Sequence, residues 1–174
     1  MRLAQIVAPE LCESPQLEHG FRLHDIGMLG VSDHILLKRG PLSQSELDEI
    51  REHPWLGERI VAHAPYLSGV ARQVIGSHHE KWDGTGYPRR LEGGDIPLAA
   101  RIFAIADAYD SMTSHQPYRE ALPVEFAFVE ISDKAGTHFD PVLAEAFLTI
   151  AGQLVSTTRS AHELKAIQSL DETL

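Results

Sequence analysis

The sequence has little of three things: cysteine, positive charge and long hydrophobic runs. Cys12 is the single cysteine in 174 residues, so an intramolecular disulfide is excluded and the sequence argues against a Cys-based zinc site. This composition favours a reducing compartment, and we expect the cytoplasm. No apolar run approaches the roughly 20 residues of a membrane helix, and no basic stretch followed by an apolar segment marks a signal peptide. Membrane insertion of this chain is therefore not expected.

Positive charge is scarce, because 15 Lys and Arg residues face 25 Asp and Glu residues, which gives a formal net charge of −10. A chain without an excess of basic residues is a poor binder of DNA, RNA or anionic lipid. With 43% hydrophobic and 23% charged residues, the composition is that of a folded protein rather than a disordered one. The length suits one domain with a terminal extension.

Helical spacing of apolar residues dominates the sequence, and no segment shows the alternation of a strand. Ser43 and Glu46 have the spacing of a capping box, and Pro97 is a favoured first-turn residue. Helices are expected over residues 1–12, 17–27, 43–53, 56–61, 68–79, 97–110, 123–134, 141–150 and, weakly, 160–170. The segments 28–42 and 82–97 carry several Gly and Pro residues and are expected to be loops. The predicted fold class is all-α, a compact helical bundle.

Ten histidines are the most informative feature. Several imidazoles and carboxylates fall at expected helix ends or beside apolar helical positions: His24, Asp25, His53, His78, His79 and Asp107. Taken singly, each has an ordinary explanation; Asp107, for example, could cap a helix or pair with Arg101. Taken as a set, imidazoles and carboxylates without thiolates suit Mn, Fe, Ni or Zn, and an Asp can bridge two ions. Two such ions favour hydrolysis of a phosphoester.

Six motifs in order carry a resemblance to a known family. They are His24-Asp25-Ile26-Gly27, Glu52-His53-Pro54, residues 78–88 (HHEKWDGTGYP), residues 96–102 (IPLAARI), residues 106–110 (ADAYD) and residues 135–141 (AGTHFDP). Together they span about residues 17–148, and the chain resembles the HD-GYP branch of the HD superfamily of metal-dependent phosphohydrolases.

The resemblance implies a function and a metal site. Family members are all-helical phosphodiesterases that hydrolyse the bacterial second messenger cyclic di-GMP to the linear dinucleotide pGpG or to GMP, with attack by a metal-bound hydroxide. By this resemblance Asp25 would bridge two divalent ions and, with Asp107 and Arg119, act in catalysis. His24 and Asp107 would belong to one ion, and the second ion would be held by His53, His78 and His79.

The resemblance also implies a substrate site. Gly86, Tyr87 and Pro88 would form a lip of the site, with Tyr87 placed to stack on a guanine. Asp110 would lie near the substrate, and the planar guanidinium of Arg119 would face a phosphate oxygen.

Three departures from the family pattern bear on activity. The family usually has a Lys where this chain has Met28, and an Arg where it has Gln116. Loss of an oriented charge typically costs a few kcal/mol of transition-state stabilisation. The family also has a further His ligand on the helix before His24, at a position that would fall ahead of Met1, and His19 is a poor substitute. The sequence still predicts that metal binding persists.

Two alternatives to the enzyme remain at this point. One is a weakened HD-GYP domain that binds the nucleotide, or GGDEF-type proteins, and acts as a signalling module; the other is an HD phosphohydrolase with another nucleotide substrate. We expect a partial N-terminal helix over residues 1–16, the phosphohydrolase domain over 17–155 and a helical tail over 156–174. In a longer protein, a sensor or receiver domain would precede the chain.

Overall fold

The computed structural model describes residues 2–116 and 119–153, and this part of the chain is helical. Across these residues β-pairing is confined to isolated bridges, among them one between Asp83 and Glu92. No helix in this part is long and apolar enough to cross a membrane. The predicted all-α fold class is confirmed.

The helices follow one another through short connections. The α-helices are α1 (Arg2–Val7), α2 (Gln16–Arg22), α3 (Asp33–Leu36), α4 (Gln44–Arg51), α5 (His53–Val61), α6 (Val70–Ser77), α7 (Leu98–Thr113) and α8 (Val124–Asp133). Short 3-10 helices are η1 (Pro9–Glu13), η2 (Ile26–Gly30), η3 (Pro65–Leu67) and η4 (Gly93–Asp95). A further helix covers residues 141–153.

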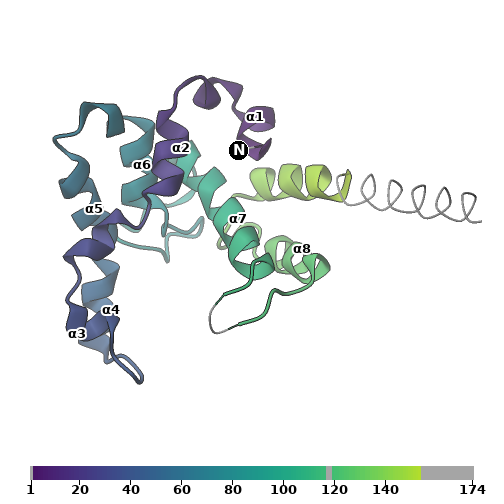
Figure 1. Ribbon diagram of the computed structural model, residues 1–174. Helices are drawn as coiled ribbons and strands as arrows, with labels where there is room; N and C mark the ends of the chain where they lie inside the picture. The colour runs from purple at the N-terminus through teal and green to yellow at the C-terminus, as the bar shows by residue number, and fades with distance from the viewer. Residues whose placement is uncertain (1, 117–118, 154–174) are drawn as a thin grey trace, which may run out of the picture.

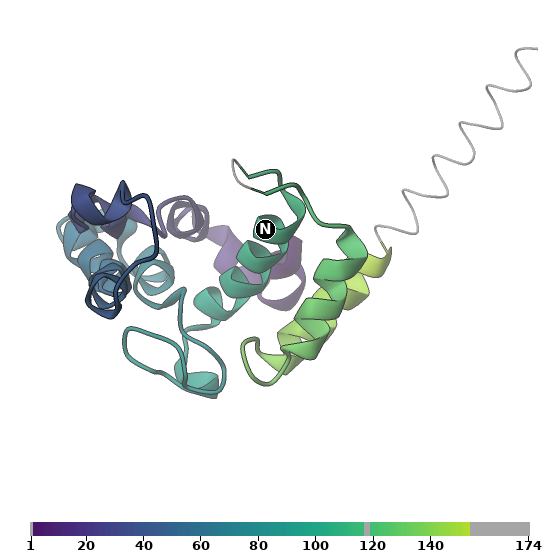
Figure 2. The same ribbon diagram turned by 90° about the horizontal axis from the view of Figure 1, so that it is seen from below.

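The long helix α7 lies in the middle of the molecule (Figure 1). On one side it packs against α6, which in turn packs against α2 and α5; on the other side it packs against α8. The short helices α3 and α4 project at one end of the molecule, and the loop between α6 and α7 forms the lower edge in Figure 2.

Two hydrophobic clusters hold these helices together. The larger one joins α1, α2, α6, α7, α8 and the helix over 141–153 around fully buried side chains such as Leu17, Ile102, Ile105 and Ile131. The smaller one joins α5, η3 and α6 around Ile75. Because both clusters include residues of α6, the C-terminal end of this helix is held firmly in the bundle.

Some expected helix ends are confirmed. Ser43 caps α4, since its hydroxyl accepts from the Glu46 N–H while the Glu46 carboxylate accepts from the Ser43 N–H. Pro97 immediately precedes α7. The segment 82–97 is a loop that contains only the short η4, as its glycines and prolines predict.

Other expectations were wrong. Residues 28–42 are not simply a loop, because they hold part of η2 and the whole of α3, which Ser32 caps. The expected helix over residues 1–12 is interrupted after Val7, and a 3-10 helix begins at Pro9. His53 does not end a helix but begins α5, since a proline at the second position of a helix is tolerated. The helix expected over 160–170 and the tail over 156–174 lie outside the described residues.

Candidate metal centre

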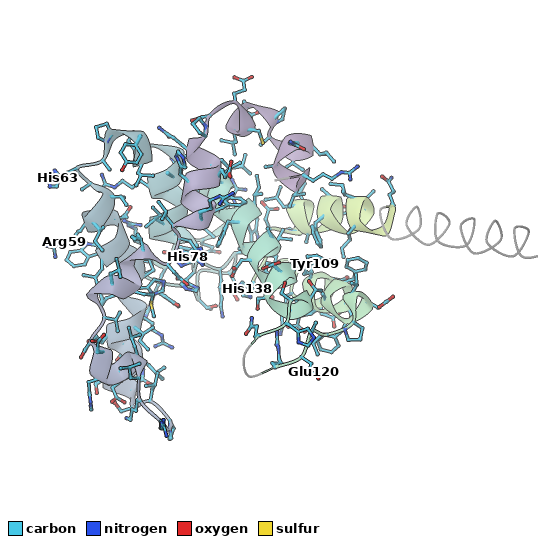
Figure 3. The ribbon with its side chains drawn as sticks, in the orientation of Figure 1. Arg59, His63, His78, Tyr109, Glu120 and His138 are labelled. Atoms are coloured by element: carbon cyan, nitrogen blue, oxygen red, sulfur yellow. The ribbon has the colours of Figure 1, made fainter. Side chains whose placement is uncertain are left out.

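Four of the predicted ligands come together in one cluster. Asp25, His53, His78 and His79 each offer a ligand atom, and these atoms lie within 4.8 Å of one another. Asp25 immediately precedes η2, His53 begins α5, and His78 immediately follows α6. Figure 3 shows His78 in the interior of the molecule, whereas His63 lies at its outer edge.

Two histidines of the cluster, His53 and His78, and the neighbouring His24 are oriented by the backbone of their own turns. In each ring the Nδ1 atom lies at hydrogen-bond distance from the carbonyl oxygen three residues earlier: 2.9 Å for His24, 2.8 Å for His53 and 3.0 Å for His78. A carbonyl only accepts, so Nδ1 carries a proton and donates. The opposite nitrogen, Nε2, is then the free ligand atom, as in protein metal sites where the second ring nitrogen is anchored.

The Nε2 atoms point at one another and at a carboxylate. Those of His53 and His78 are 3.1 Å apart, and they lie 3.2 and 3.5 Å from Oδ1 of Asp25. Two imidazole lone pairs and a carboxylate at such distances repel unless a cation, either a proton or a metal ion, lies among them. The donor set therefore fits a divalent transition metal that prefers nitrogen and oxygen ligands.

The pKa values reflect this arrangement. When Nε2 of His24, His53 or His78 is protonated it donates to Asp25, and these hydrogen bonds hold the pKa of the Asp25 carboxyl group far below its ordinary value. Burial lowers the pKa of His79 to about 3, with smaller effects of the nearby imidazoles of His78 and His53. His79 is therefore neutral at pH 7 and has a lone pair available. Burial also acts to lower the pKa of His24, but the hydrogen bond and charge of Asp25 outweigh it and raise this pKa.

His24 and Asp107 stand beside this cluster. Nε2 of His24 is 3.3 Å from Oδ2 of Asp25, the oxygen that does not face His53 and His78. The two oxygens of Asp25 thus face different partners, which is the arrangement that bridging requires. Asp107, on α7, is close enough to feel the charges of His24 and His78, and partial burial of its carboxyl group raises its pKa.

An aromatic wall behind the cluster was missed by the sequence analysis. Phe103, buried on α7, packs against the ring of His24 at 4.7 Å between centroids and against Phe21 at 4.9 Å. Its ring is also 6.0 Å from that of His78. Its position in the apolar stretch of α7 gave no signal beyond that of a core residue.

Gly86, Tyr87 and Pro88 form a lip next to the cluster. The backbone N–H of Tyr87 donates to the carbonyl oxygen of His79 at 3.2 Å, and the Tyr87 ring stacks on the His79 ring at 4.7 Å. Burial raises the pKa of Tyr87 to about 12, so its hydroxyl stays protonated and can donate. A Cβ on Gly86 would clash with Lys81 N and would lie 2.6 Å from His79 O, so this approach requires glycine.

A buried carboxylate that the sequence analysis did not assign shapes the loop after the lip. Glu80 is 2% exposed, and its two oxygens accept from the backbone N–H groups of Arg89 at 2.7 Å and Leu91 at 3.1 Å. The guanidinium of Arg89 binds the Gly76 carbonyl oxygen and the Glu58 carboxylate, which ties the loop to α6 and α5. These contacts join residues 9 to 31 positions apart, which local sequence patterns do not reveal.

The remaining predicted substrate residues lie around the C-terminal end of α7. The hydroxyl of Ser114 donates to Asp110 at 3.1 Å. Arg119 is exposed, and its guanidinium donates to the carbonyl oxygen of Ser111 in the last turn of α7, where a cation is favourable. Gln116 donates to the same carbonyl oxygen at 3.2 Å. The roles of Asp110 and Arg119 stay predictions.

Two further sequence expectations can be placed. The ring of His19 packs edge-on against Tyr66 at 6.5 Å, in keeping with its being a poor substitute ligand. The pairing of Arg101 with Asp107 is not formed, because the guanidinium of Arg101 binds the buried carboxylate of Asp140 at 2.7 Å. Asp140 also accepts from the N–H of Val142, so it caps the helix over 141–153.

Comparison with known proteins identifies the family. The family model described as "HD domain" matches residues 4–143, and the chain belongs to this family of metal-binding phosphohydrolase domains. A "Probable cyclic di-GMP phosphodiesterase" of Vibrio cholerae is 45% identical over 133 residues, which is 72% of this chain and 30% of that protein. A "3'3'-cGAMP-specific phosphodiesterase 2" of the same organism is 36% identical over 148 residues, 84% of this chain and 28% of that protein.

A solved structure agrees with this assignment. An HD-GYP protein of Bdellovibrio bacteriovorus is 25% identical, with a TM-score of 0.62, and the match covers 86% of this chain and 48% of that one. The resemblance to HD-GYP domains is thus confirmed. The chain spans about a third or less of the length of these two curated relatives.

Proposed function

We propose that this chain is a metal-dependent phosphodiesterase that hydrolyses cyclic di-GMP to pGpG or GMP. One observation carries the proposal: the backbone-anchored imidazoles of His53 and His78 converge with His79 and Asp25 on a common point beside Tyr87. A relative 45% identical over 72% of this chain has the name of such an enzyme.

Each residue has a defined task in this proposal. Asp25, His53, His78 and His79 would hold one divalent ion, and Asp25, His24 and Asp107 would hold a second. Fe, Mn, Ni or Zn could serve as either ion. Bound there, the ions supply Lewis acidity toward a phosphoester. The protonated hydroxyl of Tyr87 donates to the substrate at the lip. Asp110 contacts the nucleotide, and Arg119 leaves the Ser111 carbonyl to meet a phosphate oxygen.

A second candidate function is a nucleotide-binding signalling module with weak or no turnover. Met28 and Gln116 favour it, because neither side chain can place a positive charge on the phosphate. The same surface would then serve for contact with a GGDEF-type protein. We further propose that the protein lies in the cytoplasm and acts together with a further signalling domain. The two curated relatives are longer than this chain and have room for such a domain.

The test is turnover of cyclic di-GMP by the purified chain loaded with Mn or Fe, with products separated by chromatography. We expect linear dinucleotide or GMP from the wild-type chain and none from Asp25→Ala. His63→Ala, at an exposed position just after α5, is the matched control and should retain turnover. Metal and nucleotide binding without product would instead favour the signalling module, and a generic phosphodiester hydrolysed as fast as cyclic di-GMP would favour another substrate.

A further inference from the structure

A hollow of about 610 Å³ lies between the end of α4 and the loop that carries Tyr87. Arg51 and Glu52 line it from the helix side, and Lys81 and Arg90 line it from the loop side. Tyr87 borders the hollow and stacks on His79 of the metal cluster, so the two sites are neighbours. The volume is within the range of about 300–1,000 Å³ that small-molecule sites occupy.

The hollow contains one acidic group that is available to a ligand. Of its two carboxylates, that of Asp48 is engaged, because it accepts from Gln44 at 2.9 Å and from Arg51 at 3.2 Å. Glu52, between α4 and α5, is exposed, and within residues 2–116 and 119–153 no hydrogen bond or ion pair holds its carboxylate. An uncommitted carboxylate in a hollow next to a phosphohydrolase centre can accept hydrogen bonds from a substrate.

The hollow also contains cations that are not neutralised. In the described part of the chain Lys81 and Arg90 form no ion pair. Arg90 is held at a φ of +56°, a conformation that costs free energy for any residue but glycine. The cause is the buried carboxylate of Glu80, which binds the amides on both sides of it, those of Arg89 and Leu91. The loop therefore presents Arg90 at the hollow despite the conformational cost.

Arg51 is paired with Asp48 at 3.2 Å and also lies beside Tyr87. Its guanidinium carbon lies 5.9 Å from the centroid of the Tyr87 ring, within the range of a cation–π contact. A guanidinium can bind O6 and N7 of guanine at once, and a base can also stack on its plane. A carboxylate accepts from the N1–H and the 2-amino group of guanine but finds no such pair of donors on adenine.

We propose that this hollow is a guanine-selective subsite, in which Glu52 reads the Watson–Crick edge of one base, Arg51 faces its other edge, and Lys81 and Arg90 face a phosphate. This inference rests on the proposed function and assigns Glu52 as its specificity-determining residue. A subsite for one guanine separates cyclic di-GMP from cyclic di-AMP, which has no guanine to place in it.

The experiment compares cyclic di-GMP with cyclic di-AMP on the Mn-loaded full chain. The ratio of kcat/KM values is measured where both are hydrolysed, and the ratio of Kd values where they are only bound. We expect the wild-type chain to prefer cyclic di-GMP, and Glu52→Gln to reduce this preference by about 10- to 100-fold, the discrimination typical of one paired contact to a base edge. Glu145→Gln, an exposed carboxylate on the helix over 141–153, should leave the preference unchanged.

The outcomes separate the subsite from the function. If the wild-type chain processes cyclic di-GMP and Glu52→Gln, with unchanged metal content and melting temperature, retains the full guanine preference, the subsite is overturned while the phosphodiesterase stands. If the wild-type chain neither binds nor hydrolyses either nucleotide, both proposals fail. Arg90→Gly provides a second variant: it should weaken cyclic di-GMP binding about tenfold without lowering the melting temperature, because glycine accepts the φ of +56°.

Discussion

The Nε2 atoms of His53 and His78 lie 3.1 Å apart, although Nδ1 of each ring is bonded to a backbone carbonyl oxygen. Two lone pairs this close to each other and to Asp25 destabilise the fold at neutral pH unless a cation separates them. The protein therefore uses part of its folding free energy to keep a cation site assembled.

Divalent metal is expected to stabilise the fold through this site. At a concentration of Mn or Ni about 100 times the Kd, the gain is roughly 2.7 kcal/mol. For a chain of this size that corresponds to a rise in melting temperature of about 5–10 °C. Melting curves with and without metal, together with metal analysis of the purified protein, measure it. His53→Ala should abolish the rise and His63→Ala should keep it; a purified chain without metal and without any shift would contradict the site.

Gly86→Ala should destabilise the lip beside the metal cluster. A Cβ at this position would clash with Lys81 N and lie 2.6 Å from both Glu80 Cα and His79 O, so backbone atoms of the histidine segment must move. Overpacking of this kind costs about 1–3 kcal/mol. We expect a lower melting temperature and loss of phosphodiesterase turnover.

Gly94→Ala is the matched control for this change. It lies in the same loop, and a Cβ there has no atom within 4 Å, so it should behave as the wild-type chain. Equal stability and turnover of the two variants would show that the close approach at Gly86 is not required.

Local chemistry made part of the fold predictable from the sequence. The capping box at Ser43 and the proline before α7 act within one helical turn, so the residues themselves report the structure. The helix end expected at His53 was wrong because the same proline signal fits both the end of one helix and the start of the next. Ser32, which caps α3, was outweighed by the glycines around it.

The candidate site was predictable to a different extent. Its ligands could be proposed because motifs in a known order carry them. The residues that support these ligands could not be predicted, because Glu80, Arg89 and Phe103 act through contacts between distant parts of the chain. Glu80 illustrates the reason: next to two histidines it is equally plausible as a ligand, and only the folded loop shows that it binds two amides instead.

Glu46→Gln should lower stability in a way that depends on pH. Hydrogen bonds from Lys38 and Ser43 lower the pKa of Glu46 to about 2, from an ordinary value of 4.5. A carboxyl group whose pKa is lower in the folded than in the unfolded chain stabilises the fold above the unfolded value, and this contribution is lost as the pH falls toward the folded value. The variant should therefore be less stable than the wild-type chain at pH 7, with the difference shrinking between pH 4.5 and about 2.

Urea unfolding at a series of pH values measures this difference. Glu10→Gln, an exposed acid in η1 that takes no part in a capping box, is the control and should show little change across the range. A constant difference between Glu46→Gln and the wild-type chain from pH 7 to pH 3 would show that the carboxylate charge is not what stabilises the start of α4.

Met28→Lys should raise turnover of cyclic di-GMP. Met28 lies in η2, and its N–H donates to the carbonyl oxygen of Asp25 at 2.8 Å, so its side chain starts three residues from the metal cluster. An ammonium group there can donate hydrogen bonds to a phosphate, whereas a thioether cannot. An oriented charge of this kind is worth about a hundredfold in rate, so we expect a gain of about 10- to 100-fold in kcat.

Leu29→Lys is the matched control for this last change, since Leu29 is the next residue in η2 and is 78% exposed. It adds the same charge to the same turn but directs it into solvent, so a general electrostatic attraction of the substrate would raise turnover in both variants. A gain confined to Met28→Lys shows that position 28 faces the reacting phosphate and that the missing cation limits the natural rate. No gain in either variant, with metal and nucleotide still bound, would instead support the signalling module, in which the loss of this cation is part of the function.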